Sequence, residues 1–327
     1  MHVAILGATG AVGRTMLEVL EERNFPVDQL TLLASERSAG SKLTWKGNEY
    51  TLKAPETGSF EGVDVAIFSA GGARSLEWGP RAAAEGAVVV DNSSAWRMDP
   101  EVPLVVPEVN AAAITNRPKG IIANPNCSTI QVVVALEPLR QAAGLRRVVL
   151  TTFQSVSGAG EKGKEALQRE IATGSREGSP FTRPIQANAV PQIGPFDANG
   201  WSEEERKMIF EPRKIMGLPE LKVAPTCVRV PVEVSHSVEL MIELDRDMTA
   251  AEAMDVLEGA PGVILARKAE DFPTPRDAAG RDEVFVGRVR SDPDFPNVLH
   301  LWVVSDNLRK GAATNAVQIA EQLSPRS

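Results

Sequence analysis

The sequence predicts a doubly wound α/β domain that carries an inserted α+β domain. Up to about residue 126, short apolar runs alternate with helical patterns, which is typical of a parallel sheet covered on both faces. Beyond residue 127, strand-like segments follow with fewer helices between them, which favours a mixed or antiparallel sheet. A chain of 327 residues is also long enough for two hydrophobic cores. We therefore expect residues 1–126 and 307–327 to form one domain and residues 127–306 the other.

The elements of the first domain follow from hydrophobic periodicity. Residues 2–6 are an apolar run that ends at Gly7, and apolar residues recur at helical spacing from Ala11 to Asn24. This order predicts a strand, a tight turn and a helix. The same reasoning predicts strands at 29–34, 63–69, 87–91, 104–106 and 120–123 and a helix at 73–85. The small residues of the last helical stretch, 307–323, allow close packing, and we expect that helix to pack in the first domain.

The second domain is predicted in the same way. A strongly apolar helix at 128–143 opens it, and Pro212 is expected to kink or end a turn of a later helix. Segments 173–200 and 270–281 carry Pro and Gly and are expected to be long loops. Strands are predicted at 146–156, 223–232, 236–244, 262–267, 284–290 and 298–305, with helices at 161–173, 203–216 and 249–258.

Composition excludes several classes of protein. Hydrophobic residues make up 43% and charged residues 24%, as in a folded globular chain rather than a fibre or a disordered tail. The net charge of −8 opposes non-specific binding to nucleic acid or to an anionic membrane. There is no apolar run of about 18 residues, and the N-terminus enters a strand directly, so we expect a soluble, cytoplasmic protein. Any anion that this acidic chain binds must meet a local cationic pocket.

A glycine loop, GATGAVG at 7–13, lies between the first strand and the first helix. Glycines allow the tight turn and let backbone amides approach a pyrophosphate at the positive end of the helix, which predicts a dinucleotide site. The second strand is followed by Ser35, Glu36, Arg37 and Ser38. A guanidinium and hydroxyls suit a 2′-phosphate, which favours NADP over NAD. Glu36 leaves NAD open, because its carboxylate could instead hold a ribose hydroxyl.

The two cysteines are too few for a disulfide framework or a cysteine-based zinc site. Cys127 lies between a short strand and an apolar helix, where helix amides and the dipole lower a thiol pKa and favour a nucleophile. The alternative is a small buried hydrophobe, and Cys227, in an apolar strand, fits that alternative better. A thiol nucleophile needs a proton carrier, and among the three histidines His236 is the best candidate by elimination.

Taken together, the motifs resemble the aspartate-semialdehyde dehydrogenase family. The resemblance runs from residue 3 to residue 321, with nine motifs in the family's order. Related N-acetyl-glutamyl-phosphate reductases carry a glycine before the cysteine, where this chain has Asn126. The motifs are GATGAVG, SERSAG, FSAGG, DNSSAWRMD, NPNCST, FQSVSGAG, EEERK, CVRVPVEVSH and DNLRKGAATNAVQIAE.

The resemblance implies a role for each matching residue. Cys127 would form a thioacyl enzyme, His236 would act as acid and base, and Gln154 would orient the intermediate. Arg229 would bind the substrate α-carboxylate and Glu204 its amino group, while Arg97 and Lys207 would bind phosphate or the acyl phosphate. The implied cofactor contacts are Gly7, Thr9, Gly10, Ala11, Val12, Gly13, Ser35, Arg37, Ser38, Ser157, Gly158 and Asn307.

The family further implies a Rossmann-like NADP-binding domain and a catalytic and dimerisation domain. The implied activity is reversible, NADPH-dependent and phosphate-dependent reduction of L-4-aspartyl phosphate to L-aspartate 4-semialdehyde, in the biosynthesis of diaminopimelate, lysine, threonine and methionine. A homodimer or homotetramer without a metal, nucleic acid or membrane partner is expected. Two other interpretations stay open at this point: a reductase for a different acyl phosphate or acyl thioester, and a non-catalytic dinucleotide-binding module.

Overall fold

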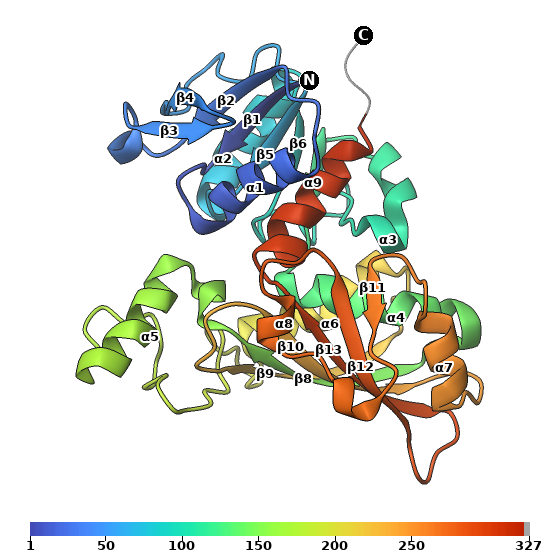
Figure 1. The fold of residues 1–327 in the computed structure, drawn as a ribbon. Coiled ribbons are helices and arrows are strands. Elements are labelled where there is room, and N and C mark those ends of the chain that lie inside the picture. The colour runs from blue at the N-terminus through green and yellow to red at the C-terminus, as the bar shows by residue number, and fades with distance from the viewer. Residues whose placement is uncertain (324–327) are drawn as a thin grey trace. The chain divides into compact units, whose positions relative to one another are not determined.

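The computed structural model describes residues 1–323 as two compact units. The first unit comprises Met1–Pro125 and the segment from Ala312 onward, and the second comprises Asn126–Gly311. The elements of both are labelled in Figure 1. The unit boundaries differ from the predicted domain boundaries at both junctions. Residues 307–311 belong to the second unit, where Asn307 accepts hydrogen bonds from three of its serines. Residues 324–327, which the prediction assigns to the first domain, lie outside the described residues.

The first unit is built on a five-stranded parallel sheet with the strand order β2-β1-β5-β6-β7. The order reverses between β1 and β5, which is the point where doubly wound folds bind their ligands. The strands are β1 (His2–Leu6), β2 (Gln29–Leu33), β5 (Val65–Phe68), β6 (Val88–Asp91) and β7 (Ile121–Ala123), and a separate hairpin is formed by β3 (Lys42–Trp45) and β4 (Asn48–Thr51).

Amphipathic helices pack on this sheet, because their buried apolar residues recur on one face. In α1 (Ala11–Glu22), Met16, Val19 and Leu20 are fully buried, and α9 (Thr314–Glu321) joins the same core through Ala316 and Val317. The return of the final helix to the first unit is therefore confirmed. The remaining elements are α2 (Gly72–Ala84), α3 (Pro107–Asn110) and the short helices η1 (Glu36–Ser38) and η2 (Ala111–Thr115).

The second unit contains a six-stranded mixed sheet with the order β11-β12-β13-β10-β8-β9. The β8–β9 and β11–β12 pairs are parallel, and the other neighbours are antiparallel. This confirms the mixed sheet that the sequence predicts. The strands are β8 (Arg147–Gln154), β9 (Lys222–Arg229), β10 (His236–Glu243), β11 (Val263–Leu265), β12 (Val284–Ser291) and β13 (Val298–Ser305).

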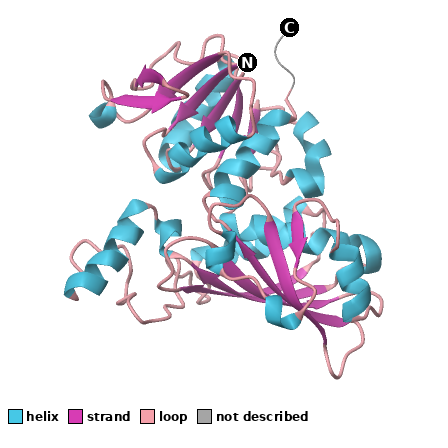
Figure 2. Cartoon of the chain, viewed as in Figure 1, coloured by secondary structure: helices cyan, strands magenta, loops and turns pink. Residues whose placement is uncertain are grey.

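Helices cover one face of this sheet, as Figure 2 shows. The main one, α4 (Cys127–Ala143), is almost wholly buried, and Leu240 and Leu301 of the sheet are fully buried beneath the helical layer. Residues that alternate with them, such as Phe153, Met241 and Trp302, are only half-buried on the opposite face. The other helices are α5 (Glu161–Thr173), α6 (Glu203–Ile215), α7 (Ala250–Leu257), α8 (Pro275–Ala278), η3 (Val156–Ala159), η4 (Ala269–Asp271) and the π-helical η5 (Arg309–Ala313).

Some predicted elements are wrong in detail. The strand expected at 104–106 is reduced to one bridge between Leu104 and Ala123. The β3–β4 hairpin was not predicted, because its strands are short and largely exposed. Pro212 neither ends nor interrupts α6, which continues to Ile215. The loop expected at 270–281 contains the short helix α8. Among residues 1–323, no helix combines the length and apolarity needed to cross a membrane.

Candidate active site

The glycine loop of the first unit requires glycine at two positions. Gly7 has φ +96°, and a Cβ there would lie 2.3 Å from the carbonyl oxygen of Ser69. A Cβ on Gly13 would lie 2.3 Å from the carbonyl oxygen of Gly7. Around Gly10, the nearest atom would be 3.5 Å away, so the local packing does not demand glycine there. The two tight contacts let the chain turn sharply from β1 into α1 and leave the start of the helix open.

A pocket opens at the carboxyl ends of β1, β2 and β5, beside this loop. Gly7, Thr9, Gly10 and Ser35 contribute to its wall, and so does Arg74 of α2. Arg37 is exposed and does not line the pocket, so Arg74 is the cationic side chain of the wall. The sequence analysis missed Arg74, although the position of FSAGG after the third parallel strand places the following helix start at this edge. Glycine amides, a hydroxyl and a guanidinium are the donors that a dinucleotide phosphate requires.

Arg97 lies in the first unit, in the segment between β6 and β7. Its side chain is 7% exposed, and it donates hydrogen bonds to the carbonyl oxygens of Asn92 (2.8 Å) and Asn124 (3.0 Å). Asn124, in the NPNC motif, is itself held by Asn92 and by Asn315 of α9. Arg97 is thus anchored by the carbonyls that follow two parallel strands, which gives its guanidinium a defined orientation.

In the second unit, Asn126 organises the turn that precedes the candidate nucleophile. Its side-chain oxygen caps α4 by accepting hydrogen bonds from the amides of Ser128 (2.9 Å) and Thr129 (3.2 Å). Its own amide donates to the buried carboxylate of Glu211 (2.7 Å), and its Nδ2 donates to Glu204 (2.8 Å). The asparagine that distinguishes this motif therefore connects the start of α4 to α6.

Cys127 is the first residue of α4 and is partly exposed, while Cys227 is fully buried in β9. Burial raises the pKa of the Cys227 thiol well above its ordinary value, which leaves it a structural hydrophobe. Cys127 instead has the helix amides and the positive end of the dipole at its position. Gly311 packs against it, because a Cβ there would lie 2.9 Å from the Cβ of Cys127.

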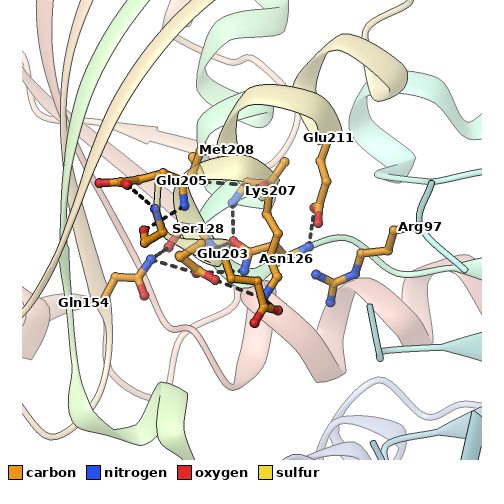
Figure 3. Close-up of polar contacts among 12 residues, drawn as sticks. Arg97, Asn126, Ser128, Gln154, Glu203, Glu205, Lys207, Met208 and Glu211 are labelled. Atoms are coloured by element: carbon orange, nitrogen blue, oxygen red, sulfur yellow. Dashed lines mark hydrogen bonds and ion pairs between the residues drawn. The ribbon is translucent and has the colours of Figure 1, made fainter. Parts of the chain in front are cut away.

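Glu204 is the centre of a polar cluster on α6. Its Oε1 accepts hydrogen bonds from Asn126 (2.8 Å) and from Gln154 Nε2 (3.0 Å), which also donates to Ser128 Oγ (2.6 Å). Lys207 lies 3.3 Å from its Oε2, and these contacts are drawn in Figure 3. Burial opposes ionisation of Glu204, but Lys207 and the hydrogen bonds outweigh it, so its pKa lies below the ordinary value. Glu204 is therefore a buried carboxylate suited to an ammonium group.

Arg229 ends β9 with 5% of its surface exposed. It donates a 2.6 Å hydrogen bond to the carbonyl oxygen of Ser155. Burial lowers its pKa, while Glu204 acts in the opposite direction. Gly158 lies close to it, since a Cβ there would be 2.7 Å from Arg229 Nη1 and 3.3 Å from His236 Nε2. Glycine at this position thus keeps the space in front of both side chains open.

His236 begins β10 and is completely buried. Its Nδ1 accepts a hydrogen bond from the amide of Ser155 (3.0 Å), and its Nε2 has no hydrogen-bond partner among the described residues. Burial and then the positive charge of Arg229 lower the pKa of His236 to about 3. The imidazole is therefore neutral near pH 7. An unsatisfied polar atom in a buried position is where a bound molecule would complete the hydrogen bonding.

The structure brings together Cys127, Gln154, Glu204, Lys207, Arg229 and His236 within the second unit, along with Ser157, Gly158 and Asn307. The glycine loop, Ser35, Arg37, Ser38 and Arg97 belong to the first unit. Sequence reasoning missed four further contributors to these clusters: Asn126, Ser155, Glu211 and Gly311. For Asn126 and Gly311, the motifs NPNCST and DNLRKG carry a signal. For Glu211, a glutamate within a helix, and Ser155, a serine at the end of a strand, the sequence carries little signal of a functional role.

Two semialdehyde dehydrogenase family models match the chain, and each matches one of the two units. "Semialdehyde dehydrogenase, NAD binding domain" matches residues 2–117, and "Semialdehyde dehydrogenase, dimerisation domain" matches residues 136–310. Together with the partly exposed cysteine at a helix start, these matches define the chain as a two-domain dehydrogenase of the semialdehyde class.

Proteins with similar sequences and structures identify the family within this class. Aspartate-semialdehyde dehydrogenase of Aquifex aeolicus is 55% identical, with 98% of this chain and 97% of that protein covered. The Bacillus subtilis enzyme of the same name is 52% identical, over 99% and 97%. A crystal structure of aspartate semialdehyde dehydrogenase II from Vibrio cholerae complexed with ASA superposes with a TM-score of 0.95 at 51% identity, covering 98% and 97% of the chains. This chain belongs to the aspartate-semialdehyde dehydrogenase family.

Proposed function

We propose that this chain reduces L-4-aspartyl phosphate to L-aspartate 4-semialdehyde, reversibly and with release of phosphate, in the aspartate pathway to lysine, threonine and methionine. The observation that carries the proposal is the arrangement around α4. A partly exposed cysteine begins the helix, and a buried carboxylate, an amide, a lysine and a buried arginine lie in the same unit. These groups match an amino-acid substrate whose side chain is an acyl phosphate.

The substrate is held by opposite charges at its two ends. Arg229 binds the α-carboxylate through its planar fork, and Glu204 binds the α-ammonium group. Lys207 of α6 and Arg97 of the first unit neutralise the phosphate. An α-ammonium group would add a further charge-assisted hydrogen bond to the Glu204 carboxylate, which a substrate without that group could not make, and this favours an amino-acid substrate.

The chemistry passes through a covalent intermediate on Cys127. Its Sγ attacks the carbonyl carbon of the acyl phosphate, the bond to the phosphate oxygen breaks, and a thioester remains. The amide of Gln154 orients this intermediate. When bound, the dinucleotide supplies a hydride to the thioester carbon. The carbon–sulfur bond then breaks and releases the aldehyde, and His236 carries the proton that leaves the thiol and returns to it.

The cofactor is a nicotinamide dinucleotide, and we propose NADP rather than NAD. The pocket beside the glycine loop fits such a group, because Gly7 and Gly13 leave the backbone open and Arg74 supplies positive charge. Arg37 and Ser38 would meet the 2′-phosphate. A solved relative from Candida albicans, with 26% identity and a TM-score of 0.77 over 98% of each chain, is described with NADP.

Association through the second unit is expected, since the dimerisation description matches it. We propose a homodimer or homotetramer that uses the half-buried face of the six-stranded sheet. A cytoplasmic location stays a prediction from the sequence. Residues 1–323 contain no group of three or more potential ligands that could hold a metal ion, and the proposed chemistry uses none.

The decisive assay follows NADPH formation from aspartate semialdehyde with and without inorganic phosphate. The proposal requires turnover that depends on phosphate and proceeds faster with NADP than with NAD. Activity that depends on coenzyme A in place of phosphate would assign the chain to a different acyl-transfer reaction. Binding of the dinucleotide without turnover under any of these conditions would identify a non-catalytic module.

A further inference from the structure

Three asparagine side chains form a continuous series of hydrogen bonds at the carboxyl ends of the parallel strands in the first unit. Asn92 follows β6, Asn124 follows β7, and Asn315 lies on α9. Asn315 Nδ2 donates to Asn124 Oδ1 (2.6 Å), and Asn124 Nδ2 donates to Asn92 Oδ1 (2.6 Å). These three residues are called the asparagine ladder below.

Main-chain carbonyls at the two ends of the ladder determine how each amide is turned. Asn92 Nδ2 donates to the carbonyl oxygen of Phe68 (3.1 Å), and Asn315 Nδ2 donates to that of Val105 (3.0 Å). A carbonyl oxygen can only accept, so the nitrogen atoms of both end amides must face these oxygens. The amide of Asn124 then has one possible orientation, with its oxygen toward Asn315 and its nitrogen toward Asn92.

The two buried members of the ladder use both N–H groups of their side-chain amides. Asn124 and Asn315 are fully buried. Asn124 Nδ2 donates to Asn92 and to the carbonyl oxygen of Ala312 (3.2 Å). Asn315 Nδ2 donates to Asn124 and to Val105. A buried network of this kind is rigid, because rotation of any amide would leave a polar group without a partner.

Two members of the ladder also hold Arg97 through their main chains. Arg97 Nε donates to the carbonyl oxygen of Asn124 (3.0 Å), and Arg97 Nη2 donates to that of Asn92 (2.8 Å). The hydrogen bond between the side chains of Asn92 and Asn124 closes a ring that includes Arg97. Nε and Nη2 lie on one edge of the planar guanidinium, so the positions of the two carbonyls determine the direction in which its plane points.

We propose that Asn92, Asn124 and Asn315 are positioning residues for Arg97, and that the ladder thereby determines how tightly inorganic phosphate binds. The inference rests on the proposed function, in which Arg97 binds phosphate or the acyl phosphate. A guanidinium holds an anion through two parallel hydrogen bonds only when its plane is correctly turned. The ladder keeps the carbonyls of Asn92 and Asn124 at a fixed spacing, and Asn315 extends this restraint to α9.

Asn92→Ala is the main test, because Asn92 is half-buried and the substitution keeps the carbonyl that Arg97 contacts. It removes the hydrogen bond that ties this carbonyl to Asn124. In the phosphate-dependent oxidation of aspartate semialdehyde, the KM for phosphate should rise about fivefold, the scale of one ordinary hydrogen bond. The KM values for NADP and for the semialdehyde should change less than about twofold, since Arg97 binds neither.

A double-mutant cycle shows whether Asn92 acts through Arg97. Arg97→Ala alone should raise the KM for phosphate at least about tenfold, because it removes a charge-assisted contact. Adding Asn92→Ala to Arg97→Ala should then have almost no further effect on this KM, since the group that Asn92 orients is gone. A purely structural role of Asn92 would raise the KM by the same factor in both backgrounds.

Asn110→Ala is the matched control within the first unit. Asn110 is also half-buried, and its side chain accepts a hydrogen bond from the amide of Val106 (2.9 Å) and donates one to the carbonyl oxygen of Leu104 (2.9 Å). The substitution therefore removes a comparable pair of hydrogen bonds outside the ladder. Thermal unfolding should show similar destabilisation in Asn92→Ala and Asn110→Ala, whereas only Asn92→Ala should raise the KM for phosphate.

The proposal is overturned if Asn92→Ala leaves the KM for phosphate as in the wild type, or raises it equally with and without Arg97. If Asn92→Ala does not fold, Asn315→Ala tests the other end of the ladder and must give the same selective rise and the same non-additivity. Failure of the proposed function gives a different result. An unchanged KM for phosphate in Arg97→Ala, or turnover that needs no phosphate, would show that Arg97 has no such role and would overturn the inference with it.

Discussion

At the scale of single residues, the two cysteines lie in opposite environments, as their local sequences predict. Cys127 is partly exposed at the first position of a capped helix, and Cys227 is buried within a strand with its pKa raised by burial. Nucleophilic attack requires a thiol that can ionise and that a substrate can reach, and burial denies both to Cys227. Cys127 is partly exposed at a helix start, where the dipole favours the thiolate.

Cys127→Ala is expected to abolish turnover and to retain NADP binding, because it removes the nucleophile and leaves the glycine loop of the other unit intact. Cys227→Ala should remain active. Rapid-quench mass spectrometry of the acyl enzyme is the measurement, with thermal unfolding of both variants as a check on folding. An acyl group recovered on a peptide containing Cys227 would reject the assignment.

Arg229→Lys separates a substrate clamp from a buried structural charge. Lysine keeps the charge but loses the planar fork, so kcat/KM for aspartate semialdehyde should fall at least about tenfold, the scale of one charge-assisted hydrogen bond. Arg81→Lys, on the exposed face of α2, serves as the control. The affinity for NADP should not change in either variant. Near wild-type kinetics in Arg229→Lys would remove the main reason for an α-carboxylate substrate.

The neutral state of His236 predicts how stability depends on pH. Its pKa is about 3 in the folded chain and about 6.5 when exposed, so below pH 6.5 the unfolded chain binds a proton that the folded chain does not. The free energy of unfolding should therefore fall as the pH is lowered through this window, by about 2 kcal/mol between pH 6.5 and 5 from this group alone.

Urea unfolding at several pH values measures this slope, and carboxylates titrate mostly below the window. His236→Gln lacks the titrating group, so its stability should vary less between pH 6.5 and 5 than that of the wild type. Equal slopes in the two proteins would mean that the folded chain accommodates a charged imidazole at this position.

At the scale of elements, close backbone contacts determine where the nucleophile lies. The start of α4 is capped by Asn126, tied to α6 through Glu211, and packed against η5 through Gly311. Each contact restrains the first turn from a different side. This explains how a cysteine in the first turn of a helix keeps a defined orientation.

Gly311→Ala should lower kcat at least about tenfold, because its Cβ would lie 2.9 Å from the Cβ of Cys127 and must displace it. Gly72→Ala is the matched control, since its new Cβ would meet its nearest neighbour at 3.9 Å. Steady-state kinetics of both variants, with circular dichroism to confirm folding, decide the matter. Unchanged kcat in Gly311→Ala would show that the first turn of α4 can shift without cost to the reaction.

At the scale of the whole molecule, one face of the six-stranded sheet is buried under helices. The side chains of its other face are only half-buried. Val149, Met241 and His300 form one register row across the centre of that second face. Half-exposed apolar side chains over several strands are typical of a surface that another protein covers. This agrees with the dimerisation description that matches the second unit.

Met241→Asp should dissociate the assembly, since it places a charge without a partner at the centre of the proposed interface. Sedimentation velocity of the full chain should show a shift toward the monomer mass. The thermal unfolding temperature of the variant should no longer depend on protein concentration. Leu76→Asp, at an exposed position on α2 of the first unit, should leave the mass unchanged. An unaltered mass in Met241→Asp would place the interface elsewhere.

Much of the architecture could be predicted because it depends on local patterns. Continuous apolar runs define the parallel strands, Gly7 and Gly13 define the turn after β1, and a polar turn before an apolar helix places Cys127 at the helix start. These patterns involve residues that are close together in the sequence, where hydrophobic periodicity and backbone conformational limits determine the local structure. The β3–β4 hairpin escaped because its short, exposed strands carry almost no such pattern.

The tertiary structure alone decided the partners. That Glu204 meets Asn126 and Gln154, that Gly158 must leave room for Arg229, and that Asn307 reaches Ser155 across 152 positions in sequence all depend on the sheet order β13-β10-β8-β9. Composition identified His236 by elimination, but only packing shows which ring nitrogen is occupied and why the ring is neutral. Hydrogen bonds between distant segments form only after the hydrophobic faces have set the register, so no local pattern encodes them.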